Sequence, residues 1–189
     1  MKVIYNEKID KEMFREVNKM GKKLSPVFGF NFPKLKFDKR LIPLAKATAR
    51  VSPNFINEKK LKTLINNIYN KDLPNLVVYI NTTPFSSWNL DKKYLSISYG
   101  RNNELKFFSA VCHESNHLMY DLTFKTQKYQ DTEIKETITI LNNLFGLKDL
   151  GWDKFSKQRK KIFNFYNQTK DFSKTIAYVQ KLFKIRREK

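Results

Sequence analysis

Both histidines of this chain lie within one pentapeptide, His113-Glu114-Ser115-Asn116-His117. Residues four apart on a helix are neighbours on one face, so two imidazoles at this spacing can point at the same ion. Glu114 lies about 100° further round the helix, where its carboxylate can hold a water on that ion. The pattern is typical of a helix that binds a metal ion for hydrolytic chemistry.

The rest of this helix places the histidines away from its apolar residues. With His113 set at 0° and about 100° per residue, His117 falls at about 40° and Tyr120 at about 340°. The apolar residues fall between about 120° and 240°: Phe107, Phe108, Val111, Leu118, Met119 and Leu122. We therefore expect the histidines opposite the core stripe, which favours metal ligands over buried structural histidines.

A third ligand is needed, because a catalytic zinc usually has three protein ligands and one open position. No other His is present, and the one Cys, Cys112, points about 100° away from His113. A carboxylate is therefore expected. Glu136 follows His117 after 18 intervening residues, on the next predicted helix and away from its apolar face. Glu133, one turn earlier, is the alternative, and one Zn²⁺ per chain is expected.

This motif with Glu136 at this distance resembles the gluzincin metallopeptidases, in particular the small minigluzincins. The resemblance implies a zincin-like fold with an active-site helix for His113 and His117, a glutamate helix for Glu136, and Glu114 as the catalytic general base. It also implies an edge strand just before the active-site helix that binds peptide substrate antiparallel. The residues in that place are Tyr94, Leu95, Ser96, Ile97, Ser98 and Tyr99.

The resemblance also raises the question of a residue that stabilises the transition state. Larger gluzincins place a His or Tyr beyond the glutamate helix for this purpose, and here only a Tyr is available. Tyr166 and Tyr178 are the candidates by position, and Tyr120, which projects to the histidine face, is a local alternative. The pentapeptide with a later Glu is also similar to intracellular metallopeptidases that act on phage-type repressors, which Glu133 would fit as well.

The elements that must position these residues can be predicted from apolar spacing and turn residues. Strands are expected at 76–80 and 94–99, the second half-exposed because its apolar residues alternate with polar ones. The segment 25–39 and the connection 81–93 are expected to be irregular. Helices are expected at 10–24, 41–51, 57–70, 103–122, 132–145, 153–168 and 171–187. This order favours an α+β fold in which a small sheet packs on helices.

Length and composition set the frame for this site. The chain has 189 residues, which favours one domain, with a helical N-terminal extension (1–72), a catalytic core (73–146) and C-terminal helices (147–189). A single Cys excludes an intramolecular disulfide. Neither a transmembrane run nor a signal-peptide stretch is found. We therefore expect a cytoplasmic protein.

The formal net charge of +19 suggests nucleic acid as a partner, but the type of cation weakens that suggestion. Lys makes up 30 of the 37 cations, and Lys is a solvated point charge, whereas Arg forms the specific forks to bases and phosphates. The sequence favours a zinc metallopeptidase, an endopeptidase rather than an aminopeptidase, with a peptide or protein substrate. An inactive zincin-like scaffold that binds zinc and a basic nucleic-acid-associated protein are the alternatives.

Overall fold

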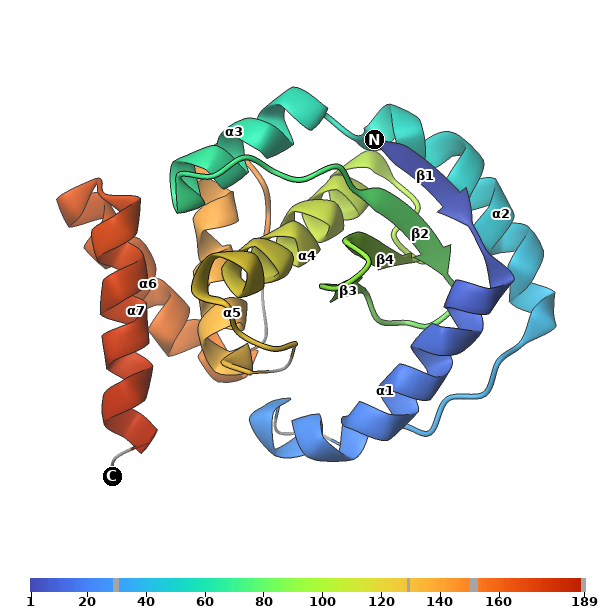
Figure 1. The fold of residues 1–189 in the computed structure, drawn as a ribbon, viewed down its shortest axis with the longest axis horizontal. Helices are drawn as coiled ribbons and strands as arrows, with labels where there is room; N and C mark the ends of the chain where they lie inside the picture. The colour runs from blue at the N-terminus through green and yellow to red at the C-terminus, as the bar shows by residue number, and fades with distance from the viewer. Residues whose placement is uncertain (29–30, 129, 150–152, 188–189) are drawn as a thin grey trace.

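A small mixed β-sheet and the helices around it form the computed structural model, which describes residues 1–28, 31–128, 130–149 and 153–187 (Figure 1). The strand order is β1-β2-β4-β3, with β1, β2 and β4 parallel and β3 antiparallel to β4. The strands are β1 (Lys2–Tyr5), β2 (Val77–Asn81), β3 (Ser87–Asn89) and β4 (Tyr94–Ser98). The predicted α+β class is confirmed.

The helices follow the expected segments closely. The α-helices are α1 (Glu7–Phe28), α2 (Ile42–Val51), α3 (Glu58–Tyr69), α4 (Glu104–Phe124), α5 (Thr132–Ile138), α6 (Ser156–Thr169) and α7 (Phe172–Arg187). The 3-10 helices are η1 (Lys39–Leu41), η2 (Ser52–Phe55), η3 (Thr139–Phe145) and η4 (Asp153–Phe155). Segment 25–39 was expected to be irregular, but its first residues continue α1 as far as Phe28.

Side-chain caps explain where α3 and α4 begin. The side chains of Asn57 and Asn103 accept hydrogen bonds from the backbone N–H of Lys60 and Lys106, respectively. Such a cap satisfies one of the N–H groups that the first turn of a helix leaves unpaired. At the other end of α4, Lys125 adopts the left-handed conformation at φ 53°. These caps fix the start and end of the helix that carries both histidines.

The predicted helix 132–145 changes type at Thr139, where η3 replaces the α-helix. The reason lies at the Glu136 carbonyl oxygen, which would accept from residue 140 in a continuing α-helix. Instead it accepts from the Thr139 hydroxyl at 2.9 Å and from Arg159 Nη1 at 2.6 Å. Side chains therefore take the bond that would have extended α5.

Residues 1–72 contain a strand that the sequence analysis did not predict. β1 pairs in parallel with β2, from Lys2 opposite Val77 to Tyr5 opposite Ile80. At four residues it is too short to show a clear alternation. The N-terminal segment therefore contributes to the sheet as well as helices.

The expectation that 94–99 forms a half-exposed edge strand is wrong. β4 lies between β2 and β3, and every residue of β4 is buried. The hydroxyls that gave the polar alternation are used internally: Ser96 Oγ accepts from Asn81 Nδ2 at 2.9 Å. Ser98 Oγ donates to the Thr83 carbonyl at 2.6 Å. The free edge on this side of the sheet belongs to β3 instead.

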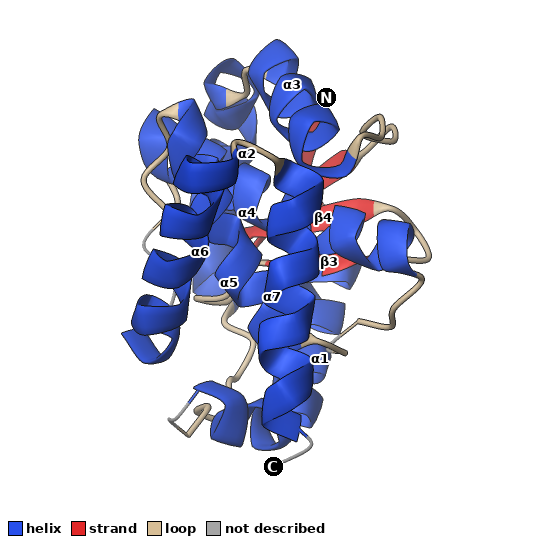
Figure 2. Ribbon diagram, turned by 90° about the vertical axis from the view of Figure 1, so that its left-hand side faces the viewer, coloured by secondary structure: helices blue, strands red, loops and turns tan. Residues whose placement is uncertain are grey.

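The layers place α4 at the centre of the molecule. Seen from the side in Figure 2, α6 and α7 are outermost, and α4 and α5 lie between them and the sheet. Leu118 and Val111 of α4 belong to one apolar core that also includes Ile97 of β4 and Val179 of α7. Among the described residues, no helix has the length and apolar character needed to cross a membrane.

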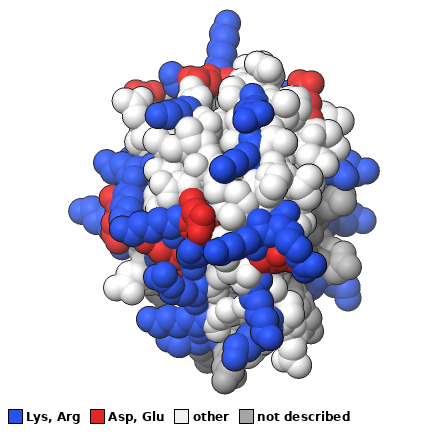
Figure 3. All heavy atoms as spheres, turned by 90° about the vertical axis from the view of Figure 1, so that its right-hand side faces the viewer, with Lys and Arg blue, Asp and Glu red and all other residues white. Residues whose placement is uncertain are grey.

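The positive charge is spread rather than gathered on the face shown in Figure 3. Lys and Arg side chains lie over much of that face, with Asp and Glu side chains between them. A face of this kind resembles an ordinary solvated surface more than a continuous basic stripe.

Candidate metal centre

The side chains of His113, His117 and Glu136 converge on one point between α4 and α5. Their nearest ligand atoms all lie within 4.8 Å of one another. The two Nε2 atoms are 2.9 Å apart. Glu136 Oε2 is 3.4 Å from His113 Nε2, and Glu136 Oε1 is 3.3 Å from His117 Nε2. Two predicted helices therefore bring together the three predicted ligands.

The structure places Glu136 in this group and Glu133 outside it. Glu136 is 6% exposed, and its carboxylate faces both imidazoles. Glu133 is only half-buried and lies one turn nearer the start of α5. Of the two glutamates that the sequence offered, Glu136 is the one positioned as a ligand.

The histidines lie in the interior of the molecule rather than on an open face of α4. His117 is 2% exposed, and the His113 side chain is 19% exposed. The projection separated them correctly from the apolar stripe of α4, but other elements cover the second face. Because α4 crosses the middle of the fold, both of its faces are buried.

The donor set fits a tetrahedral metal ion. Zinc binds His nitrogens and carboxylate oxygens at about 2.0–2.1 Å, which puts tetrahedral ligand atoms roughly 3.3 Å apart. The separations of 2.9, 3.3 and 3.4 Å lie close to that value. Glu136 Oε2 is also buried with no hydrogen bond from the described residues. Such a buried carboxylate oxygen needs a cation or donor, so the group could hold a metal ion.

Asp149 supports the first histidine, and the sequence analysis missed it. Its Oδ2 lies 2.9 Å from His113 Nδ1, on the side of the ring away from Glu136. A carboxylate in this position fixes the tautomer and the orientation of a ligating imidazole. Arg159 Nη2 donates to Asp149 Oδ1 at 3.0 Å, and Asn142 Nδ2 donates to Oδ2 at 3.1 Å. The carboxylate is therefore itself held in place.

The electrostatics around His113 favour a positive charge at the centre of the group. Burial lowers the pKa of His113, but the charges of Asp149 and Glu136 outweigh it and hold the pKa well above its usual value. Burial raises the pKa of Glu136, but His117 and His113 outweigh it and hold the pKa well below the usual range. A proton on His113 thus meets the same demand that a metal cation would meet.

Glu114 is a buried carboxyl next to this group. It is 6% exposed, and its Oε2 has no hydrogen bond from the described residues. Burial raises the pKa of Glu114 to about 7, opposed by the charge of His113 and increased by that of Glu136. A carboxyl with a pKa near neutrality can both accept and release a proton.

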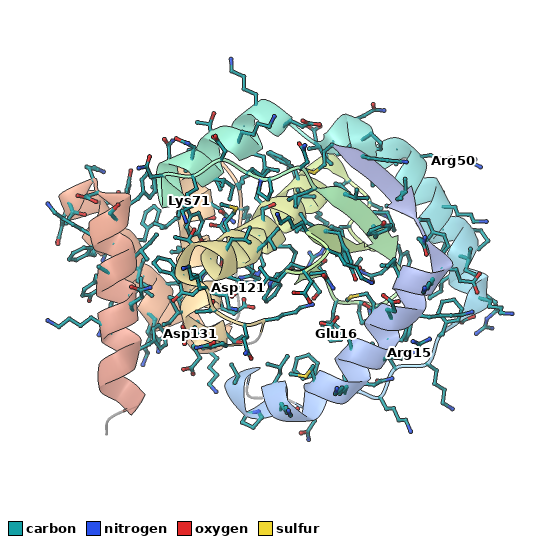
Figure 4. The ribbon with its side chains drawn as sticks, viewed as in Figure 1. Arg15, Glu16, Arg50, Lys71, Asp121 and Asp131 are labelled. Atoms are coloured by element: carbon teal, nitrogen blue, oxygen red, sulfur yellow. The ribbon has the colours of Figure 1, made fainter. Side chains whose placement is uncertain are left out.

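Trp88 of β3 holds the second histidine by packing. Its ring centroid lies 4.7 Å from that of His117. Trp88 Nε1 donates to Asp121 Oδ2 at 2.8 Å, and Lys135 Nζ forms a fully buried ion pair with Asp121 Oδ1 at 2.7 Å. Figure 4 labels Asp121 on α4. The network joins β3, α4 and α5 around His117.

The three tyrosines proposed as stabilisers contact other parts of the fold. Tyr120 is buried, and its hydroxyl accepts from Gln180 Nε2 of α7 at 3.3 Å. Tyr166 packs on Phe172, with ring centroids 4.5 Å apart, and Tyr178 stacks on Phe165 at 4.3 Å. The contacts described for all three lie with α6 and α7 rather than with the metal-ligand group.

A cavity of about 580 Å³ lies elsewhere, where β2 and β4 end. Its lining includes Thr82 after β2, Tyr99 after β4 and Phe14 of α1, and it includes neither the candidate metal ligands nor Glu114. The chemistry-bearing group and the hollow surface are therefore separate in this structure. No protein-family model matches this chain, and neither do the curated proteins or the solved structures with which it was compared.

Proposed function

We propose that this protein is a zinc-dependent metallopeptidase. The observation that carries the proposal is the convergence of His113, His117 and Glu136 beside a buried Glu114. Two His and one carboxylate are a known donor set of catalytic zinc sites. When bound, zinc supplies a Lewis acid that polarises a carbonyl and lowers the pKa of water.

The residues of this chain have distinct parts in the proposed reaction. Glu114 accepts a proton from the attacking water and passes it to the leaving amine, for which its pKa of about 7 is suited. Asp149 keeps His113 oriented through Nδ1. The antiparallel edge strand β3, in place of β4, is the strand with which an extended peptide would pair.

The test combines metal content with the removal of Glu114. We expect purified protein to carry about one zinc per chain, and Glu114→Gln to keep the metal but lose hydrolysis of a mixed peptide library. Glu104→Gln, an exposed change at the start of the same helix, is the control and should stay active. Hydrolysis by Glu114→Gln would remove Glu114 from the mechanism, and a metal-replete protein without zinc would refute the proposal.

A zinc-binding scaffold without activity is the second candidate, and burial of the site favours it. His117 and Glu136 are 2% and 6% exposed, so the group is closed to a substrate in this conformation. The same experiment separates the two functions, because a scaffold retains zinc and hydrolyses no peptide. It would also show no effect of Glu114→Gln beyond stability.

A further inference from the structure

The edge strand β3 is covered, although nothing pairs with its outer side in the sheet. Ser87 and Trp88 are each 6% exposed, and Trp88 packs against His117. A peptide that adds to a sheet edge needs access to the backbone of that edge. Some other part of the molecule must therefore lie over β3 and over the metal-ligand group behind it.

Contacts across this region identify α1 and the residues that follow it as that cover. Glu16 Oε1 of α1 lies 2.5 Å from Lys128 Nζ, and Lys128 Nζ lies 5.2 Å from the centre of the Trp88 ring. A continuous path of contacts thus runs from Glu16 through Lys128 and Trp88 to His117. In Figure 4, Glu16 lies on the inner side of α1 and Arg15 on its outer side.

Two further contacts lie beside this path. Glu12 Oε2 is 3.9 Å from Lys92 Nζ, just beyond β3. The ring of Phe32, after α1, lies 5.2 Å from that of Phe85, just before β3. The contacts therefore bracket β3 at both of its ends.

The first part of α1 is fixed much more firmly than the rest. The fully buried Asp10 accepts hydrogen bonds from the Thr82 N–H at 2.8 Å, the Thr82 hydroxyl at 2.9 Å and the Tyr5 hydroxyl at 3.1 Å. Met13 and Phe14 are buried as well. Among the described side chains from Arg15 to Val27, only Gly21 is buried.

The second part of α1 is therefore held largely by contacts that are easy to break. The Glu16 and Lys128 side chains are 27% and 18% exposed, and the Glu12–Lys92 pair is more exposed still. Ion pairs that water reaches contribute little to stability, so they can open while the buried Asp10 region remains folded.

We propose that the part of α1 beyond Phe14 is a latch over the substrate edge, closed by the Glu16–Lys128 ion pair. Opening would separate Glu16 from Lys128 and uncover β3 while Asp10 keeps the start of α1 in place. The inference rests on the proposed function, because it assigns β3 to the binding of an extended peptide. The closed latch accounts for the burial of a site built for hydrolysis.

The test breaks the ion pair and restores it with reversed charges. Glu16→Lys and Lys128→Glu each place like charges together, and the double variant Glu16→Lys/Lys128→Glu re-forms an attractive pair. The control is Glu7→Lys, the same change in the same helix at the exposed pair with Lys11. Hydrogen exchange of the β3 amides is measured on the full chain, and circular dichroism checks that each variant is folded.

We expect each single variant to speed exchange at Ser87, Trp88 and Asn89 on the order of fivefold. The double variant should return to the wild-type rate, and Glu7→Lys should not change it. Equal exchange in wild type and Glu16→Lys, or the same increase with Glu7→Lys, would refute the latch. If a single variant does not fold, Glu16→Gln, which removes the attraction without adding repulsion, replaces it in the same comparison.

Peptide hydrolysis, measured in parallel, separates the two proposals. Faster exchange together with faster hydrolysis by Glu16→Lys supports both. Faster exchange with no hydrolysis in any variant supports movement of α1 and refutes the peptidase. Unchanged exchange refutes the latch whether or not the protein hydrolyses peptides, because exchange requires neither metal nor substrate.

Discussion

Glu114 and Asp149 lie close to His113, but their surroundings shift the two carboxyl pKa values in opposite directions. Burial dominates at Glu114 and raises its pKa to about 7. At Asp149 burial also raises the pKa, but the charges of His113 and Arg159 outweigh it, so the pKa is lowered. Asp149 therefore stays ionised near neutral pH, whereas Glu114 can exchange a proton, which suits one to positioning and the other to acid–base chemistry.

Asp149→Asn should weaken metal binding without removing a ligand. The amide cannot supply the negative charge that orients and polarises His113, and loss of such a partner typically costs 10- to 100-fold in metal affinity. The dissociation constant for zinc can be measured by competition with a chromophoric chelator. Asp91→Asn, an exposed position in the turn after β3, is the control. Equal affinities in the two variants would mean that Asp149 has no positioning role.

Glu114 should make the metal-free protein less stable as the pH rises. Its folded pKa of about 7 lies above the reference value of 4.5, so its contribution is full below about pH 4.5 and is lost as the pH rises through about 7. A shift of this size corresponds to about 3 kcal/mol. Urea unfolding at pH 5 and pH 8, with chelator present, should show that loss in the wild type and not in Glu114→Gln. Parallel changes in both proteins would contradict it.

At the scale of elements, helices were predictable and strand neighbours were not. The helix α3 carries its own limits, with Asn57 at its start and Asn70 in the left-handed conformation at its end. β4 shows its period in sequence, but whether it is an edge depends on β3, a three-residue strand too short to give a pattern. Asp149 was missed for the same reason, since its role depends on where α6 places Arg159.

The buried pair Lys135–Asp121 should be the main polar link between α4 and α5. Both side chains are fully buried, so Lys135→Met leaves the Asp121 carboxylate without its cation and should cost about 3–5 kcal/mol of unfolding free energy. Lys174→Met breaks an exposed pair with Asp171 and should cost about 1 kcal/mol or less. Denaturant unfolding of both metal-free variants makes the comparison. Similar losses would mean that the buried pair contributes no more than a surface pair.

At the scale of the whole molecule, the metal-ligand group joins segments that are distant in the sequence. Glu16 of α1 and Trp88 of β3 reach it from one side, and Arg159 of α6 reaches Asp149 from the other. A ligand that binds only the folded arrangement stabilises all of these segments together. Metal binding and folding should therefore be coupled, although the apolar core extends well beyond the site.

Zinc should raise the thermal unfolding temperature of the whole chain through Glu136 and not through Glu133. At free zinc about 1,000-fold above Kd, binding adds about 4 kcal/mol, or roughly 10 °C for a chain of this size. The shift should be larger at pH 8 than at pH 6, because His113 must lose its proton to become a ligand. Calorimetry with and without zinc should show the shift in Glu133→Gln and not in Glu136→Gln. The reverse result would make Glu133 the third ligand, and the α5 geometry that brings Glu136 to the histidines would then be wrong.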